Sequence, residues 1–508
     1  MEKKGTSIVR KSASISILVI LGKVLGFIKQ AVIAWAFGSN ATMDVFVSAD
    51  SYTSMFGQIM GQTVGPTVLS QYIHLKEGGR EEKANRIIQE SFLFFSLFSA
   101  AVVLINILFS KKICHLIGLS YSADQQSELW FFLVSMLPII LFTSIIGVSS
   151  GYLDSHERFL PGRLTTLFFS VTIIVFVFFF KDRLGLRSLL YGFLLGYFLH
   201  MILVLILVVP KVGFSISNPL NNPDFRVMMK RFFPLAIGVS VIDLGHLIDK
   251  IVASSLEAGS VSALHYGQVV SSDIISAIIV SSVGPVILTS ITRSVASKAN
   301  VDSITTRIQQ IISSMTYIVA GITALYFIEG GDLIRLLLQR GSFDSSNTSV
   351  VNSIAVCYSI GFVFMANRDV LIRVHYAFQD TKTPMINSIS GVVLNIVFSI
   401  VLSKTMGIAG IALATSISML FVFGLSVMTL KKHIHCYITN RKLLFDVLKT
   451  AVCFCVTVFA GKYLFLLFEN VHFLVRMTVI GLSMCLLFVL IGVILRVSVV
   501  FVFLKRVK

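Results

Sequence analysis

Apolar runs long enough to cross a lipid bilayer follow one another along almost the whole chain. A helix needs about 20 mainly apolar residues to span the hydrocarbon layer, and all its backbone polar groups must be bonded internally there. The predicted fold class is therefore an all-α polytopic membrane protein with about 14 transmembrane helices. The predicted spans are residues 12–36, 43–72, 87–109, 127–153, 162–180, 186–209, 229–253, 258–290, 306–328, 347–377, 385–404, 408–430, 442–466 and 473–503.

The composition agrees with a membrane protein and argues against a soluble enzyme. Of the 508 residues 55% are hydrophobic and only 13% are charged, whereas soluble domains carry about 25% charged residues. The predicted loops are too short for a soluble catalytic domain, and the chain has neither a Walker-type phosphate loop nor an H-E-x-x-H motif. The six scattered cysteines indicate neither a disulfide framework nor a metal site. We therefore expect a transporter, not an enzyme, with no cofactor except a coupling Na⁺ or proton.

An internal duplication relates two halves of the chain. Val64-Gly65-Pro66 returns as Val283-Gly284-Pro285, and three further landmarks recur in the same order at offsets of roughly 219 to 224 residues. Gly/Pro-interrupted spans at matching positions of two repeats usually mark a transporter's central site. We predict an N-terminal six-helix lobe at 1–215, a C-terminal six-helix lobe at 216–435 and two additional helices at 436–508. The other landmarks are Gly38-Ser39 with Gly259-Ser260, Tyr152 and Pro161 with Tyr376 and Pro384, and Gly185 with Gly407.

Lysine and arginine are unevenly distributed over the predicted loops. If the N-terminus lies in the cytoplasm, the cytoplasmic segments hold about 25 basic residues and the outer segments about 10, in agreement with the positive-inside rule. Both termini are therefore predicted to be cytoplasmic. The net charge of +17 is interpreted as this topology signal and as an affinity for anionic membrane lipids, and nothing indicates binding of nucleic acid. No cleavable signal peptide is expected, because Lys23 and Lys29 interrupt the first apolar run.

Charged side chains inside the spans are the main candidates for function. A charge at the bilayer centre costs about 2.5–3.5 kcal/mol on insertion scales, so such residues usually face a cavity or each other. The first span carries Lys23 and Lys29, which lie about 120° apart around a helix and can border one wide cavity. The alternative is a side chain that extends to the membrane interface. That alternative is weaker for Lys23, which lies nearer the middle of its span.

Polar residues surround the duplicated Gly-Pro breaks in the second and eighth spans. The glycines of the second span alone would indicate close helix packing, but the glutamines on the same segment favour a cavity wall. Pro66 frees backbone groups that only protein or a watery cavity can satisfy. The residues predicted to line this cavity are Asp44, Asp50, Gln58, Gln62, Gln268 and Asp273.

The seventh span is the richest in charge. Asp243, His246 and Lys250 lie three and four residues apart and share one helix face. This arrangement indicates either a self-neutralising network or a site for a cation or a proton, with Asp243 as the carboxylate.

The tenth span carries Arg368, Asp369 and Arg373. Adjacent residues are not expected to face each other on a helix, whereas Arg373, one turn beyond Asp369, can pair with it. Arg373 is also a predicted cavity residue, with extension to the nearby interface as the alternative. In the next two spans, Asn395 and Thr415 offer neutral oxygens that suit a small cation.

Four sequence blocks resemble the MurJ/MviN family of lipid II flippases, within the superfamily of multidrug, oligosaccharidyl-lipid and polysaccharide exporters. They are GKVLGFIKQ at 22–30, EAGSVSALHY at 257–266, QRGSF at 339–343 and RVHYAFQDTKTP at 373–384. The predicted number of spans also matches that family and exceeds that of the related drug/sodium antiporters. The resemblance implies a two-lobed, V-shaped transporter of the bacterial cytoplasmic membrane. Such a protein moves an undecaprenyl-pyrophosphate-linked glycan from the inner to the outer leaflet by alternating access.

The resemblance also assigns roles to residues. Lys23 and Lys29 stand where the family has cavity arginines that attract the pyrophosphate, and Arg368 is a third candidate for that role. Lysine keeps the charge but loses the bidentate fork of arginine. Two further family arginines are replaced, one by the Gly57-Gln58 pair and one by Gln268.

A sodium site seen in some family members is matched in part. Asp243 fits its carboxylate, and Asn395 and Thr415 fit its polar ligands. Ser399 stands where a second carboxylate would be expected.

Several functions follow from this pattern. The leading hypothesis is a lipid II flippase for peptidoglycan synthesis. Because family arginines are replaced, the main alternative is a flippase for another lipid-linked oligosaccharide, such as a surface polysaccharide, an O-antigen-like glycan or a teichoic precursor. A cation-coupled drug exporter would need acidic cavity residues, whereas the first span is basic. A degenerate flippase that acts as a scaffold is a further alternative, with cell-wall synthesis enzymes as candidate partners.

Overall fold

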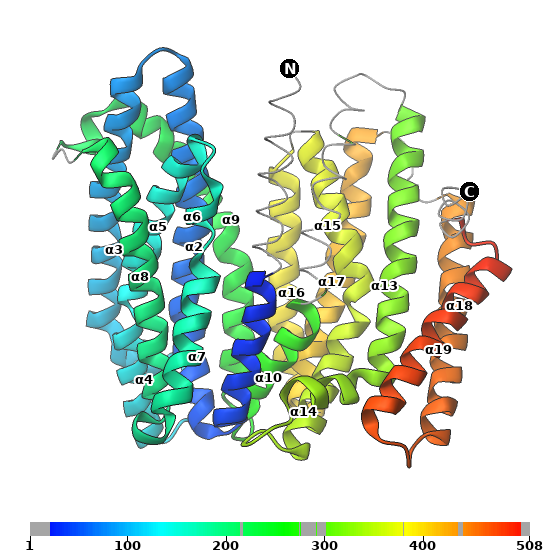
Figure 1. Cartoon of the computed structure of the whole chain (residues 1–508). Helices are drawn as coiled ribbons and strands as arrows, with labels where there is room; N and C mark the ends of the chain where they lie inside the picture. The colour runs from blue at the N-terminus through cyan, green and yellow to red at the C-terminus, as the bar shows by residue number, and fades with distance from the viewer. Residues whose placement is uncertain are drawn as a thin grey trace. The chain divides into compact units, whose positions relative to one another are not determined.

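A computed structural model describes residues 21–213, 217–273, 275, 291, 301–378, 380–434 and 440–498 of the chain. These residues form helices and turns with no strand among them (Figure 1), which confirms the predicted all-α fold class. The first described helix covers residues 21–37. The elements that follow are α2 (Ala41–Glu77), α3 (Glu81–Ile117), α4 (Ala123–Met136), α5 (Pro138–Ser155), α6 (Phe159–Gly162), α7 (Thr165–Leu184), α8 (Arg187–Val212), η1 (Pro219–Asn221), α9 (Pro223–Ala253), α10 (Ser260–Gln268), η2 (Val269–Asp273), α13 (Val301–Leu338), α14 (Ser345–Ile360), α15 (Phe362–Ala377), α16 (Lys382–Met406), α17 (Ile408–Ile434), α18 (Arg441–Leu467) and α19 (Phe473–Ile494).

Each predicted span coincides with one helix or with consecutive helices over its described residues. In this part of the chain eight helical segments are long and apolar enough to cross a membrane, or nine if α14 and α15, bent by 45° relative to each other, form one span. The chain is thus a multi-pass membrane protein. The second Gly-Pro break, Val283-Gly284-Pro285, lies outside the described residues.

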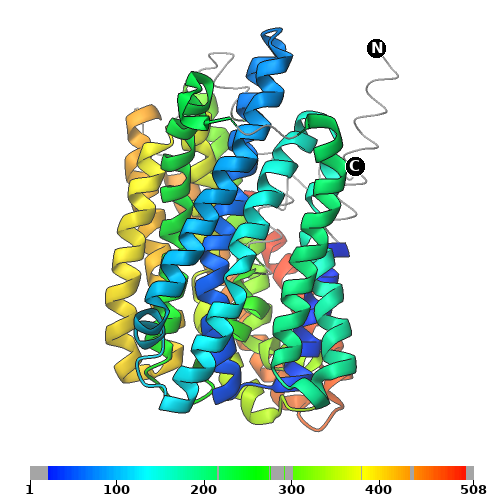
Figure 2. The ribbon, with the colours of Figure 1, turned by 90° about the vertical axis from the view of Figure 1, so that its left-hand side faces the viewer.

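The contacts within the chain divide it into two compact units. Unit 1 comprises Met1–Ser262 and Arg340–Phe343, and unit 2 comprises Ala263–Gln339 and Asp344–Lys508. Figure 2 shows the helices of unit 1, coloured blue to green, running side by side. The lobes predicted at 1–215, 216–435 and 436–508 rest on the sequence repeat and not on contacts, so their boundaries stay predictions.

Two pairs of repeated glycines have the same kind of backbone conformation. Gly185, between α7 and α8, and Gly407, between α16 and α17, have φ angles of +54° and +59°. Gly38 and Gly259 have φ angles of +64° and +93°. Glycine adopts this left-handed region without the clash that a Cβ would cause, so its recurrence at matching positions supports the duplication.

Unit 1 contains a close contact between α2 and α5. A Cβ added to Gly151 would lie only 2.6 Å from the carbonyl oxygen of Gly65, and one added to Gly147 would lie 3.1 Å from Cβ of Val64. The two backbones can approach this closely only because the contact residues are glycines. For Gly65, helix packing is therefore the correct interpretation. Gly61, by contrast, faces open space.

The α5 segment Gly147-Val148-Ser149-Ser150-Gly151 has the letters of the G-x-S-x-G nucleophile elbow of hydrolases. That elbow requires a sharp turn between a strand and a helix. Here the segment is continuous helix, and the Ser149 hydroxyl donates to the Ile145 carbonyl at 2.9 Å. At this position the pattern therefore does not indicate a hydrolase nucleophile.

In unit 2 the C-terminal helices α18 and α19 pack against α13 (Figure 1). The Arg476 guanidinium of α19 donates to both carboxylate oxygens of Asp332 on α13 at 2.7–2.8 Å. It also lies 4.3 Å from the centre of the Phe465 ring on α18. On α13, Ser313 donates to Asp446 of α18 at 3.3 Å. Polar contacts as well as apolar packing thus hold the additional helix pair.

Candidate functional site

A polar stripe runs along α2 in unit 1. Asp50, Ser54, Gln58 and Gln62 follow at intervals of four residues and share one helix face. Ser54 Oγ donates to Asp50 Oδ1 at 2.8 Å, and Gln62 Nε2 donates to Gln58 Oε1 at 2.6 Å. Gln58 and Gln62 are exposed. The glutamines predicted to line a cavity therefore lie on the open side of α2, away from its packing against α5.

Lys29, on the helix at 21–37, carries a buried positive charge. The residue is 8% exposed, and its ammonium forms no hydrogen bond or ion pair with any residue that the structure describes. Its Nζ lies 4.6 Å from the centre of the Phe169 ring on α7, a cation–π contact, and the nearby Asp50 acts on it electrostatically. A buried ammonium without a hydrogen-bonded partner costs folding free energy. An anion bound at Lys29 would offset part of that cost.

Helix α9 brings two more charged groups to α2. Lys250 Nζ donates to Ser51 Oγ at 2.7 Å, and its charge acts on both Asp50 and Asp243. The Oδ2 atom of Asp243 is buried and has no hydrogen-bond partner in the described part of the chain. Unit 1 thus gathers two ammonium groups and two carboxylates around α2. Their pairing is incomplete at both Lys29 and Asp243.

The other basic residue predicted in the first span lies differently. Lys23 is exposed, whereas Lys29 is buried. The two side chains therefore differ in environment although they lie only six residues apart on one helix. Of the two, Lys29 is the buried one, and its ammonium lacks a hydrogen bond or ion pair within the described fold.

Asp44 has its carboxylate fully engaged inside unit 1. Oδ2 accepts the N–H of Gly259 at 2.6 Å, and Oδ1 accepts the N–H and the hydroxyl of Ser262, each at 2.7 Å. Ser39 Oγ donates to the Gly259 carbonyl at 2.9 Å. Asp44 thereby caps the start of α10 and joins the two repeated Gly-Ser corners. This placement favours a structural role over the predicted lining of a cavity.

The predicted pairing in α15 is wrong. Arg368 donates to Asp369 Oδ1 from Nη2 at 2.8 Å and from Nε at 3.1 Å. Adjacent positions do diverge on a helix, but the long arginine side chain folds back to the neighbouring carboxylate. Arg373 makes no ion pair among the residues described. As a pyrophosphate ligand, Arg368 would first have to release Asp369.

Gln268 and Asp273 flank a π-helical turn. Gln268 ends α10 and is half-buried, and Asp273 ends η2 and is exposed. Within this turn the Val270 carbonyl accepts the hydroxyl of Tyr326 on α13. Single π-helical turns are rare and often occur near functional sites.

The predicted sodium ligands lie on three helices. Asn395 and Ser399 are buried on α16 and Thr415 is half-buried on α17, all in unit 2. Asp243 lies on α9 in unit 1. The four-residue sodium site stays a prediction.

Sequence analysis did not identify Ser54 and Phe169, which contact Asp50 and Lys29 in unit 1. Ser54 could have been found, because it falls at the four-residue interval between Asp50 and Gln58. Phe169 is one of 42 phenylalanines, and only the packing of α7 brings its ring to Lys29. No local pattern marks that contact.

Comparisons with known proteins agree on one family. The family model described as "Lipid II flippase MurJ" matches residues 33–484. A probable lipid II flippase MurJ of Borreliella burgdorferi is 24% identical and covers 90% of this chain and 89% of its own. The corresponding protein of Vibrio cholerae is 26% identical, with coverages of 80% and 79%.

Solved structures show the same fold. The structure titled "Lipid II flippase MurJ, inward closed conformation" matches with a TM-score of 0.80 and 22% identity, over 95% of this chain and 98% of that one. An inward-facing multidrug resistance transporter of the MATE family and the MOP superfamily matches with a TM-score of 0.68 and 13% identity, over 81% and 94%. The architecture is thus shared well beyond recognisable sequence similarity.

Proposed function

Because this chain belongs to the MurJ family of lipid II flippases, which are transporters and not enzymes, we propose that it translocates lipid II. The substrate is an undecaprenyl-pyrophosphate-linked peptidoglycan precursor, carried from the inner to the outer leaflet. The structural observation that supports this proposal is Lys29, a buried ammonium with which no described residue forms a hydrogen bond or an ion pair.

Lys29 suits the recognition of a pyrophosphate. Phosphate oxygens would give its ammonium the charge-assisted hydrogen bonds that the described fold does not supply. Asp50 lies nearby and acts on Lys29 electrostatically. The exposed Lys23 adds a second cation on the same helix. Because lysine acts as a point charge and not as a fork, this pair would tolerate some movement of the phosphates during transport.

The polar stripe of α2 suits the rest of the headgroup. The exposed amides of Gln58 and Gln62 both donate and accept hydrogen bonds, as the hydroxyl and amide groups of a glycopeptide require. Alternating access then follows from differential affinity, because a ligand shifts a conformational equilibrium only as far as its affinities for the two states differ. The pyrophosphate should therefore bind most tightly to the conformation in which Lys29 has no protein partner, and so stabilise that conformation.

Asp243 is the proposed coupling carboxylate. Its buried, unpartnered Oδ2 suits a Na⁺ ion or a proton, and Asn395, Ser399 and Thr415 remain the proposed neutral ligands. We also propose that both termini lie in the cytoplasm, that anionic lipids surround the basic loops, and that cell-wall synthesis enzymes are partners.

Complementation of a strain depleted of its own flippase tests the proposal. We expect Lys29→Ala to abolish growth and outer-leaflet exposure of lipid II in spheroplasts. Lys29→Arg should retain most of both, because the charge is kept. Lys462→Ala, at an exposed position of α18, is the matched control and should behave as the wild type. Normal growth and lipid II exposure with Lys29→Ala, at equal membrane abundance, would disprove the anion-binding role.

A flippase for another lipid-linked oligosaccharide is the second candidate. It is favoured by the exposed Gln58, which stands where the resemblance predicts an arginine. In the same depletion experiment, unchanged lipid II exposure together with loss of a surface polysaccharide would identify this substrate instead.

A further inference from the structure

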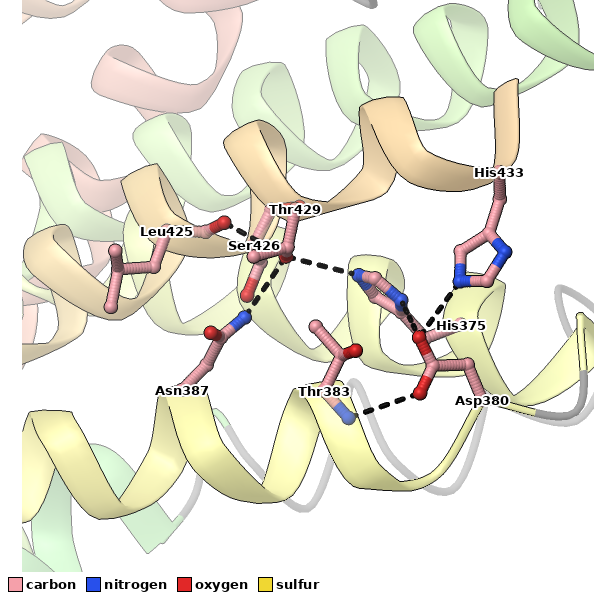
Figure 3. A network of polar contacts seen from close by, with 8 residues as sticks. All are labelled: His375, Asp380, Thr383, Asn387, Leu425, Ser426, Thr429 and His433. Atoms are coloured by element: carbon pink, nitrogen blue, oxygen red, sulfur yellow. Dashed lines mark hydrogen bonds and ion pairs between the residues drawn. The ribbon is translucent and has the colours of Figure 1, made fainter. Parts of the chain in front are cut away.

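A cluster of three potential metal ligands lies at one end of unit 2 (Figure 3). His375 belongs to the last turn of α15, Asp380 follows in the loop before α16, and His433 lies near the end of α17. Their ligand atoms all lie within 4.8 Å of one another. Asp380 Oδ2 is 2.8 Å from His433 Nε2 and 3.5 Å from His375 Nδ1. This is the one such group found in the part of the chain that the structure describes.

The hydrogen bonds of Thr429 suit one tautomer of His375. The Thr429 hydroxyl donates to the Leu425 carbonyl at 2.9 Å, so its oxygen is left to accept from His375 Nε2 at 3.4 Å. With Nε2 as the donor to Thr429, a neutral His375 carries its lone pair on Nδ1. Asn387 Nδ2 also donates to the Thr429 oxygen, at 3.1 Å.

The lone pair of His375 faces a carboxylate. Nδ1 is buried and has no hydrogen-bond partner among the described residues, although Asp380 Oδ2 lies 3.5 Å away. The carboxylate also contacts the Thr383 N–H through Oδ1, at 3.0 Å, and His433 Nε2 through Oδ2, at 2.8 Å. In this tautomer a nitrogen lone pair and a carboxylate oxygen lie 3.5 Å apart, an arrangement that a cation bound between them would stabilise.

We propose that His375, Asp380 and His433 bind one divalent transition-metal ion, with Zn²⁺ as the expected occupant. Two imidazoles and one carboxylate form a common ligand set for this ion, which leaves a fourth position for water. Ligand atoms at about 2.0–2.1 Å from Zn²⁺ in a tetrahedral site are about 3.3 Å apart, close to the separations seen here. His433 is 18% exposed in its side chain, which gives the ion a route from solvent.

The groups around these ligands suit a metal site as well. Metal-bound histidines usually donate their other N–H to a fixed acceptor, which is the role of Thr429 for His375. The Thr383 N–H donates to Asp380 Oδ1 at 3.0 Å and leaves Oδ2 for the ion. A bound ion would tie the α15–α16 loop to the end of α17. The proposal does not depend on which lipid the chain carries.

Metal binding to the purified full-length protein tests the proposal directly. The protein is prepared in detergent with a tag that contains no histidine, stripped with EDTA, and titrated with Zn²⁺ by calorimetry and with Co²⁺ by visible absorption. We expect about one ion per chain and a Zn²⁺-dependent rise in the apparent Tm, because the ion binds the folded protein.

Substitutions separate ligands from bystanders. His375→Gln and His433→Gln should each weaken Zn²⁺ binding at least tenfold, and Thr429→Val, which removes the acceptor for His375, should weaken it by about tenfold. His115→Gln, at an exposed histidine of α3, should leave the affinity unchanged. If His375→Gln does not fold, His433→Gln near the helix end decides. Absence of stoichiometric uptake by the wild type, or equal affinity in His433→Gln, would overturn the proposal.

Discussion

At the residue scale, function is indicated by charges that the fold does not compensate. Asp44 is buried and accepts three hydrogen bonds, which satisfy its carboxylate and account for its burial. Lys29 is buried and has no such bond in the described part of the chain. Proteins violate the rules of polar satisfaction mainly at functional sites. The contrast therefore favours Lys29 over Asp44 as the residue proposed to bind an anion.

This contrast predicts that Lys29→Met is more stable than the wild type. Replacing an uncompensated buried charge with an apolar side chain of similar length should raise the free energy of unfolding by about 1–4 kcal/mol, although transport is lost. Apparent Tm in detergent measures the effect, with Lys462→Met at an exposed position of α18 as the control. A clear loss of stability in Lys29→Met would show that the ammonium serves the fold.

Sequence patterns identified which charges to examine but not how they pair. Lys23 and Lys29 lie on one predicted helix, yet in the structure Lys29 is buried and contacts Phe169 of α7, whereas Lys23 is exposed. Arg368 reaches Asp369 because its side chain is long and flexible, a property that helical spacing ignores. Pairing depends on rotamers and on neighbouring helices, which one-dimensional periodicity does not contain.

At the scale of elements, the glycines of unit 1 have two different uses. Those at the contact of α2 with α5 let two backbones approach, whereas Gly61 lies on the open side of α2. Sequence alone predicted the helices well, because long apolar runs determine them. It missed the cluster of His375, Asp380 and His433, because the two histidines lie far apart in the sequence and only the packing of α15 on α17 brings them together.

A matched pair of substitutions tests the close contact. Gly151→Ala places a Cβ 2.6 Å from the Gly65 carbonyl oxygen, so we expect a loss of about 1–3 kcal/mol or more. Gly61→Ala meets no atom within 4 Å and should be neutral or stabilising by about 0.5–1 kcal/mol. Thermal unfolding followed by size-exclusion chromatography compares the two. Equal stability of both variants would show that α5 can shift away from α2.

The attachment of α19 to α13 gives a second test at this scale. Asp332→Ala removes the bidentate partner of Arg476, whose side chain is only 11% exposed, and should cost about 3–5 kcal/mol. Glu329, one turn earlier, has both carboxylate oxygens buried without a hydrogen-bond partner in the described chain. Glu329→Gln should therefore cost little or nothing. Apparent Tm ranks the variants, and a larger loss for Glu329→Gln than for Asp332→Ala would refute this assignment.

At the scale of the whole molecule, the two repeats share backbone features, whereas their candidate functional side chains differ. The repeated glycine corners keep the same backbone conformation in both halves. Among the described residues, the polar stripe with Lys29 lies in unit 1, and the His375, Asp380 and His433 cluster lies in unit 2. A search limited to sites that recur in both repeats would therefore miss both features, although the sequence repeat supports the predicted helical architecture.

The coupling of transport to an ion is also a property of the whole molecule. In our proposal, Asp243 is the carboxylate that binds the coupling ion. Its buried Oδ2 lacks a hydrogen-bond partner among the described residues, so a bound Na⁺ should stabilise the folded protein in proportion to ln(1 + [Na⁺]/Kd). We expect the apparent Tm to rise with NaCl but not with choline chloride at equal ionic strength, and Asp243→Asn to abolish the difference. Asp182→Asn, at an exposed carboxylate near the end of α7, should keep it. If wild type and Asp243→Asn respond alike to Na⁺, Asp243 does not hold the ion and is not the coupling carboxylate.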